Sequence, residues 1–377
     1  MHITVTNTLS AVPAASWDRL VDAREPFLSH AVLYGMEAHD CLEGQGWQSS
    51  HLLAYELDQL VGALPLYIRD NSYGEFVFDW AWAEAYERAG GHYYPKLVTA
   101  VPFTPVTGSR LLLASNAPVA TATSLVNFAI QLAADHRLSS WHCLFPSEQQ
   151  LAAIDHPDII LREGCQYHWF NQEYRDFEAF LATLTSKRRK EIRRERREVS
   201  AAGIEIEVFE GQAITEALWD IFYRFYCDTF DRKWGAPRFT ASFFKHLSTS
   251  NAATPILFLA RAGTEYVAGA FALRGSDTLF GRHWGCNRFV KNLHFELCYY
   301  QTIDYCIRHG LARVDAGAQG EHKITRGFNP VKTWSAHWIR DPGFRRAVAD
   351  FCRRERAHID DYVTSVEAQL AYREADQ

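Results

Sequence analysis

The sequence lacks the long apolar runs and cysteine patterns that mark membrane-spanning or disulfide-stapled proteins. No apolar stretch of about 18 residues occurs anywhere, and the N-terminus has no basic start followed by an apolar core. A transmembrane helix and a secretory signal are therefore not expected. The eight cysteines include no CxxC pair, which favours reduced thiols over disulfides or a zinc site. We expect a cytoplasmic protein, and peripheral contact with the inner membrane stays open.

An excess of positive charge is also missing. The net charge is −6, which argues against a general nucleic-acid binder with a strongly basic surface. Apolar residues make up 47% of the chain and aromatic residues 14%, as in a packed globular protein. A chain of 377 residues is long for one hydrophobic core, so two domains are expected.

The chain contains an approximate internal repeat. The segment "LVGALPLYI" at 60–68 resembles "YVAGAFALR" at 266–274. Each half later has a helix-like segment that leads into a strand and then reaches a His-Trp pair, at 168–169 and at 337–338. Because the matching segments keep their order, we interpret them as a duplicated domain with loops of different length. Chance similarity between strand-rich segments is the alternative.

Each half reads as helices, a hairpin, a further strand, a helix, a strand, and a final strand and helix. Tight turns such as the one at Gly263 make the first strands antiparallel, whereas the later strand–helix–strand passage favours a parallel pair. The sequence therefore predicts an α/β fold with mixed sheets in two domains, residues 1–180 and 181–377.

A basic segment, "SKRRKEIRRERREVSAAG", opens the second half. It predicts a helix capped by Ser186 and ended by Gly203, followed by a strand at 204–210. Eight Lys or Arg stand against three Glu between Lys187 and Glu198. The helix is either a solvated surface with internal ion pairs or a phosphate-facing surface for a tRNA, a nucleotide or a lipid headgroup.

Two stretches resemble a known family. "TLTSKRRKEIRRERREVSAAGIEIEV" resembles the element that opens the second half of the Fem-type peptidoglycan aminoacyltransferases. "GRHWGCNRFVKNLHFELCYYQTIDYCIRHGLARVDAGAQGEHKITRGFNP" is similar to the FemAB-like predicted N-acyltransferases, which are often labelled peptidoglycan biosynthesis or recognition proteins. The resemblance covers nearly the whole chain. It implies two tandem GNAT (N-acetyltransferase-like) domains and the transfer of an acyl group to an amine.

The resemblance leaves the acyl donor open. Relatives use acyl-CoA or aminoacyl-tRNA, and similar proteins have been linked to bacterial ceramide synthesis, in which a fatty acyl group joins a sphingoid-base amine. The R/Q-x-x-G-x-G/A pyrophosphate loop of simple acetyl-CoA enzymes is not legible in either half. We expect no bound cofactor, with acyl-CoA, acyl carrier protein thioester or aminoacyl-tRNA as co-substrate. An acyl carrier protein or a tRNA would meet the basic helix at 187–197.

Candidate acid and base residues gather in the second half. His294 and Glu296 lie where a strand gives way to a helix, and Glu321 and His322 follow the glycine turn in "GAQGEHK". Neighbouring strands would bring both loops to one sheet edge, where a carboxylate can set the tautomer and basicity of an imidazole. Helix capping, a core imidazole and a metal site are the alternatives, although neither HxxxH nor HxH spacing supports a metal.

Residues around these four form the predicted donor site. Two glycines allow the backbone to approach a ligand, and cations neutralise a phosphate or polarise a carbonyl. The set comprises Gly317, Gly320, Gln319, Lys323, Arg326, Arg282 and His283. Structural ion pairs and tight turns are the alternatives. The resemblance favours Lys323, because relatives carry a lysine after this strand.

The first half lacks this set, so we expect it to bind or shape the acceptor. Its aromatic residues line an apolar acceptor channel or belong to the core; they are Trp80, Trp82, Tyr86, Tyr93 and Tyr94. No cysteine sits in a nucleophile setting, so direct attack by the amine is expected. The predicted function is an N-acyltransferase acting from an acyl thioester on an amine such as a sphingoid base. The alternatives are an aminoacyl-tRNA-dependent aminoacyltransferase and a non-catalytic protein that binds cell-wall precursors.

Overall fold

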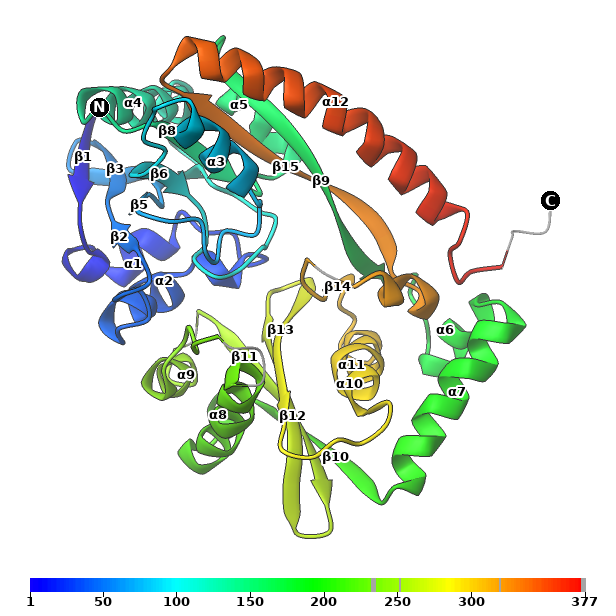
Figure 1. Cartoon of the computed structure of the whole chain (residues 1–377). Coiled ribbons are helices and arrows are strands. Elements are labelled where there is room, and N and C mark those ends of the chain that lie inside the picture. Colours follow the sequence, from blue (N-terminus) through cyan, green and yellow to red (C-terminus); the bar gives the residue numbers. More distant parts are fainter. Residues whose placement is uncertain (232–234, 251, 319, 374–377) are drawn as a thin grey trace. The chain divides into compact units, whose positions relative to one another are not determined.

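The computed structural model describes residues 1–231, 235–250, 252–318 and 320–373 (Figure 1). The chain divides into two compact units. Unit 1 comprises residues 1–165 and 332–362, and unit 2 comprises residues 166–331 and 363–377. Each unit is therefore assembled from two separate stretches of the chain.

Unit 1 contains a small antiparallel sheet and a set of mixed strands. The small sheet has the order β1 (His2–Thr6), β3 (His51–Glu56), β4 (Gln59–Leu64) and β7 (Leu112–Leu113). The second set has the order β15 (Asn329–Ile339), β8 (Ser140–Leu144), β6 (Lys96–Thr99), β5 (Tyr67–Arg69) and β2 (Trp47–Ser49). Strands β6 and β8 run parallel, and the other pairs of this set are antiparallel.

Helices cover these strands and close the core of unit 1. They are α1 (Ala14–Asp18), α2 (His30–Ala38), α3 (Trp80–Arg88), α4 (Thr121–Asp135), α5 (Leu151–Ile154) and most of α12 (Pro342–Glu367), with short turns η1 (Leu9–Ala11), η2 (Pro26–Leu28) and η3 (Glu148–Gln150). Helix α4 buries Leu125, Ala129 and Ala133 at the spacing of one helix face, against Trp141 of β8 and Trp338 of β15.

Unit 2 is built on one mixed sheet. Its strand order is β10 (Ile204–Glu210), β11 (Thr254–Ala262), β12 (Glu265–Arg274), β13 (Thr278–Cys286), β14 (Arg313–Asp315) and β9 (Ile159–Phe170). Strands β10 to β13 are antiparallel, β13 and β14 are parallel, and β14 and β9 are antiparallel. The expected parallel pair after the hairpin is therefore present.

The helices of unit 2 lie on both faces of this sheet. They are α6 (Phe177–Thr183), α7 (Ser186–Ala201), α8 (Glu216–Asp231), α9 (Ala241–Leu247), α10 (Leu293–Phe295) and α11 (Gln301–Arg308), with η4 (Gly211–Ala213), the π-helical turn η5 (Glu296–Tyr300) and the 3-10 turn η6 (Glu321–Arg326). Figure 1 shows α8 and α9 on one face and α11 on the other. Helix α7 begins at Ser186, and Thr185 rather than Ser186 takes the N-cap position.

The last strand of each half ends in the unit built mainly from the other half. Residues 168–170 of β9 pair with β14 in unit 2, and residues 335–339 of β15 pair with β8 in unit 1. The two His-Trp pairs therefore occupy corresponding strands. The two compact units are defined by this exchange of strands and not by the duplication. A boundary near residue 180 between the duplicated segments therefore stays a prediction. Every helix that the structure describes is too short or too polar to cross a bilayer.

Candidate active site

The turn after β14 depends on two glycines. The strand ends at Asp315, and the chain then passes Gly317 (φ 80°) and Gly320 (φ 113°) to enter η6. A Cβ atom at residue 320 would lie 2.6 Å from the His322 ring. Glycine is needed there both for the positive φ and for the close approach of that ring. Gln319 lies outside the described residues.

Asp315 is the centre of a buried charge cluster. Arg282 of β13 donates from Nη1 to Oδ1 at 3.0 Å and from Nη2 to Oδ2 at 3.1 Å. The N–H of Gly317 donates to Oδ1 at 2.9 Å, and His168 Nε2 lies 3.8 Å from Oδ2. Burial would raise the pKa of Asp315, but the Arg282 guanidinium and His168 hold it below its usual range. The charge of Arg282 is therefore balanced within the protein.

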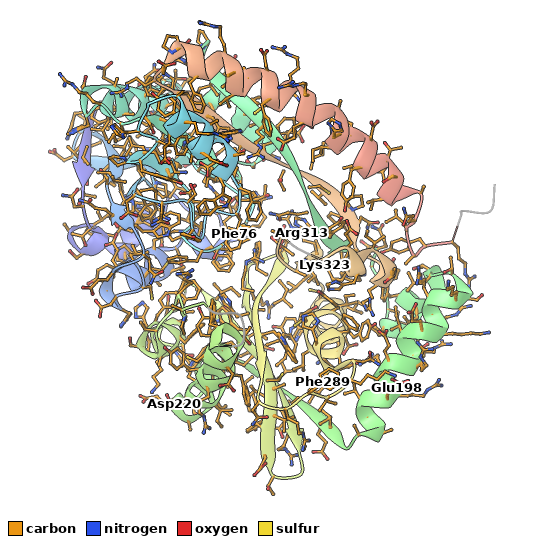
Figure 2. The ribbon with its side chains drawn as sticks, viewed as in Figure 1. Phe76, Glu198, Asp220, Phe289, Arg313 and Lys323 are labelled. Atoms are coloured by element: carbon orange, nitrogen blue, oxygen red, sulfur yellow. The ribbon has the colours of Figure 1, made fainter. Side chains whose placement is uncertain are left out.

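Lys323 fastens η6 to this turn. Its side chain is buried, and Nζ donates to the carbonyl oxygens of Ala316 at 2.8 Å and Gly317 at 2.7 Å. Burial lowers the pKa of Lys323 to about 8, although Asp315 acts in the opposite direction. The two bonds use two of the three ammonium hydrogens, which leaves one for a substrate oxygen. Figure 2 labels Lys323 together with Arg313, the first residue of β14.

His322 is paired with a tyrosine. The Tyr299 hydroxyl of η5 and Nε2 of His322 are 2.7 Å apart, and either tautomer of the imidazole allows this hydrogen bond. Burial raises the pKa of Tyr299, so its hydroxyl stays protonated. Partial desolvation of the ring and the cations Arg326 and Lys323 lower the pKa of His322, which leaves the imidazole neutral at pH 7. The pair combines a proton acceptor with a proton donor.

The structure brings the two predicted histidines together, but Glu296 faces elsewhere. The His294 ring centroid lies 6.1 Å from that of His322 and 5.5 Å from that of Tyr299. Oε1 of buried Glu296 accepts hydrogen bonds from Arg196 of α7 and from Gln301 at 2.8 Å. Glu296 therefore anchors α7 to η5.

Three other predicted residues lie in surroundings that differ from those of the His322–Tyr299 pair. Arg326 is buried and forms a structural ion pair with Glu195, to which it donates at 2.9 and 3.1 Å. Its guanidinium carbon lies 3.5 Å from the Phe295 ring centroid. His283 packs between aromatic rings, and burial lowers its pKa to about 3, so the imidazole carries no charge for a phosphate at neutral pH. Glu321 is exposed.

Asp315 and Tyr299 are the functional candidates that the sequence patterns missed. Asp315 could have been suspected, because it closes a strand directly before a glycine turn. Tyr299 lies five residues after His294, a spacing that brings side chains together only in a π-helical turn. Among the residues that the structure describes, no three His, Cys, Asp or Glu side chains form a metal-binding group.

Several solved structures are similar to this chain. The C-terminal domain of a putative lysylphosphatidylglycerol synthetase from Agrobacterium fabrum has a TM-score of 0.54 at 8% identity, covering 90% of this chain and 94% of its own. FemX has a TM-score of 0.54 at 10% identity, covering 93% and 100%. A tandem GNAT protein from the clavulanic acid biosynthesis pathway has a TM-score of 0.45 at 11% identity, covering 90% and 99%.

The first two structures, each with a TM-score of 0.54, confirm the expected mixed α/β fold. At such low identity they bear on the fold alone. No curated protein matches the sequence. The family described as peptidoglycan biosynthesis/recognition, FemAB-like, matches residues 8–374. The chain belongs to the FemAB-like family.

Proposed function

We propose that the protein is an N-acyltransferase that moves an acyl group from a thioester, acyl-CoA or acyl carrier protein, to an amine. The observation that carries this proposal is the neutral His322 paired at 2.7 Å with the protonated Tyr299. Buried Lys323 beside the end of β14 supplies the third element. Family and fold support a GNAT-type transferase.

The pair supports a balanced transfer of one proton. In the tautomer that carries hydrogen on Nε2, Nδ1 of His322 accepts the proton of the attacking amine while Nε2 donates to the Tyr299 oxygen. The Tyr299 hydroxyl gives its own proton to the leaving sulfur and takes up the Nε2 proton in exchange, which leaves a neutral His322 with its hydrogen on Nδ1. A C–N bond forms, the C–S bond breaks, and one proton passes from nitrogen to sulfur. The third Lys323 hydrogen stabilises the oxyanion, and solvent resets the exposed imidazole.

The test follows free thiol and product mass with purified full-length protein. Donors are acyl-CoA and acyl carrier protein thioesters of short to long chain, and acceptors are sphingoid bases and simple amines. His322→Asn should lower turnover by about 10²–10⁴ and Tyr299→Phe by about 10². His309→Asn and Tyr266→Phe are matched controls, because both lie in unit 2 and outside this pair.

Two results would decide against the proposed site. Wild-type turnover in both His322→Asn and Tyr299→Phe would remove the pair from the chemistry. If the variants lose turnover and also lose their cooperative thermal transition, these residues would be assigned to folding instead. No thiol release with any thioester would exclude the thioester donor.

Aminoacyl transfer from tRNA is the second candidate function. On α7, the side chains of Lys187, Lys190 and Arg197 form no ion pair with any residue that the structure describes, and all three are exposed. Such a cationic face suits a polyphosphate backbone. Membership of the FemAB-like family, which resembles the Fem-type aminoacyltransferases, also favours inclusion of this donor. An assay arm with charged tRNA decides it, and silence with every donor would favour a binding role.

A further inference from the structure

The segment that joins β5 to α3 in unit 1, together with the first residue of α3, exposes aromatic side chains and buries polar ones. Residues 71–80 expose Tyr73 (60%), Phe78 (53%) and Trp80 (39%), whereas their polar neighbours Ser72, Glu75 and Asp79 are buried at 3–4% exposure. Phe76, labelled in Figure 2, lies between them and is half-buried. Soluble surfaces normally have the reverse arrangement. We call residues 71–80 the aromatic loop.

Two buried cations hold the polar side chains of the aromatic loop inward. Lys96 Nζ donates to Ser72 and Glu75 at 2.8 Å each, and to Asp79 at 2.6 Å. Arg69 Nε donates to Glu75 at 3.2 Å. Burial would raise the pKa of Asp79, but the Lys96 ammonium holds it below its usual range. Two carboxylates face two cations, so the charges of the buried cluster balance, and among the described residues only Oδ1 of Asp79 has no hydrogen-bond partner within the cluster.

The backbone of the aromatic loop is fixed as well. Arg69 donates to the carbonyl of Tyr73 at 2.8 Å, and Arg162 donates to the carbonyl of Val77 at 2.7 Å. Phe76 (φ 63°) and Phe78 (φ 55°) occupy the left-handed region, which bulky residues adopt only where the surroundings impose it. The aromatic side chains are therefore presented outward by a rigid loop.

We infer that the aromatic loop docks the protein onto a lipid bilayer by entering its interfacial layer. From residue 71 to residue 83 no charged side chain is exposed, and burial of Glu75 and Asp79 removes the charges that anionic headgroups would repel. Tyr and Trp are the side chains enriched at membrane–water interfaces, because their rings are amphipathic. This inference does not rest on the proposed transferase activity.

The lipid surface is favoured over a second copy of the chain or another protein. The rings of Tyr73 and Trp80 lie 4.7 Å apart, so they form one apolar patch that can enter a layer together. An interface between proteins would gain from ion pairs at its rim, but residues 71–83 carry no exposed charge, and the exposed charges that flank them along the chain, Asp70 and Glu84, are both acidic. Binding that depends on aromatic burial should also be insensitive to salt, unlike binding by α7.

The test is vesicle flotation of the full chain at low and high salt, with phosphatidylcholine vesicles and with vesicles that contain phosphatidylglycerol. Wild-type protein should float with both, and salt should change little. The triple variant Tyr73→Ser/Phe78→Asn/Trp80→Ser should partition about 10²–10³-fold less, since each buried aromatic contributes about one power of ten. Asn tolerates the left-handed backbone at residue 78.

Matched controls separate the alternatives. Phe289→Asn removes another highly exposed aromatic residue, 87% exposed, and should leave flotation unchanged. Lys187→Gln/Lys190→Gln should leave flotation with phosphatidylcholine unchanged. The three single variants, each with its thermal transition intact, should each lose about tenfold, which keeps the test valid if the triple variant fails to fold.

Three outcomes would overturn the inference. Wild-type flotation by the folded single variants would exclude the aromatic loop as the contact. If the protein floats only with anionic vesicles, and salt or the α7 substitutions abolish this flotation, binding would be electrostatic. Lipid-free self-association that the aromatic substitutions abolish, measured by sedimentation, would identify a second copy as the occupant.

Discussion

At the scale of single residues, the site combines neighbours with opposite environments. His322 is exposed and its pKa lies below the usual 6.5, whereas Lys323 is buried with a pKa of about 8. Lys323 faces carbonyl oxygens and the Asp315–Arg282 pair, and His322 faces a hydroxyl. One side chain is therefore suited to take up a proton at pH 7 while the next keeps its charge.

This arrangement predicts a bell-shaped dependence of kcat/KM on pH. As pH rises, His322 loses its proton below pH 6.5 and becomes a base, so activity increases. Above about pH 8, Lys323 loses its charge and activity falls. The measurement is a pH profile with one acyl-CoA and one amine, corrected for ionisation of the amine. His322→Asn should flatten the acid limb and keep the alkaline limb; a profile without limbs would contradict both roles.

Asp315 should carry a large share of local stability. Asp315→Asn leaves the buried Arg282 guanidinium without its carboxylate, and breaking a buried pair costs about 3–5 kcal/mol. Urea unfolding measures the free energy of unfolding. The control is Asp304→Asn, which removes an exposed i,i+4 pair with Arg308 and should cost about 0.3–0.5 kcal/mol. Equal losses in the two variants would show that Arg282 finds other compensation.

At the scale of elements, local patterns located most strands and helices of the second half. The strand at 204–210 and the basic helix that begins at Ser186 are present as β10 and α7. Polar residue types and glycine turns also singled out His294, His322 and Lys323, whose roles in catalysis stay predictions. The π-helical turn η5 could not be predicted, because no residue pattern separates it from an α-helix, so Tyr299 was missed.

Close packing of α8 on β13 gives a prediction at this scale. A Cβ atom at Gly285 would lie 1.9 Å from the carbonyl oxygen of Phe225, and backbone atoms cannot rotate away. Gly285→Ala should therefore cost at least about 1–3 kcal/mol or prevent folding. Gly281→Ala on the same strand meets no atom closer than 3.9 Å and should unfold at nearly the wild-type temperature. Thermal denaturation compares the two, and similar transition temperatures would contradict the contact.

At the scale of the whole molecule, the duplicated pattern predicted two domains but not the exchange of their last strands. Strand patterns report which face is buried, and they do not report which partner a strand will pair with. Trp169 and Trp338 were recognisable as a matched pair. Only the structure shows that Trp169 pairs with Val314 in unit 2 and Trp338 with Trp141 in unit 1.

Fragments cut at residue 180 should not fold alone. Residues 1–180 lack β15, whose Ala336 and Trp338 pack in the core of unit 1. Residues 181–377 lack Trp169, which is fully buried and pairs with β14. We expect neither fragment to show a cooperative melt by circular dichroism, and the two to copurify as a folded complex when expressed together. A stable, monomeric fragment 1–180 would contradict this dependence.

The exchange of strands also determines when unit 1 can complete its folding during biosynthesis. Leu144 of β8 pairs with Ser335, which the ribosome adds about 190 residues later. At roughly 5–20 residues per second, β8 waits about 10–40 s with that edge unpaired. An N-terminal domain ordinarily matures while the rest of its chain is being made, whereas unit 1 has to remain incomplete until residues 335–339 have been synthesised. A nascent chain of this protein therefore presents an open strand edge to chaperones throughout synthesis of its second half.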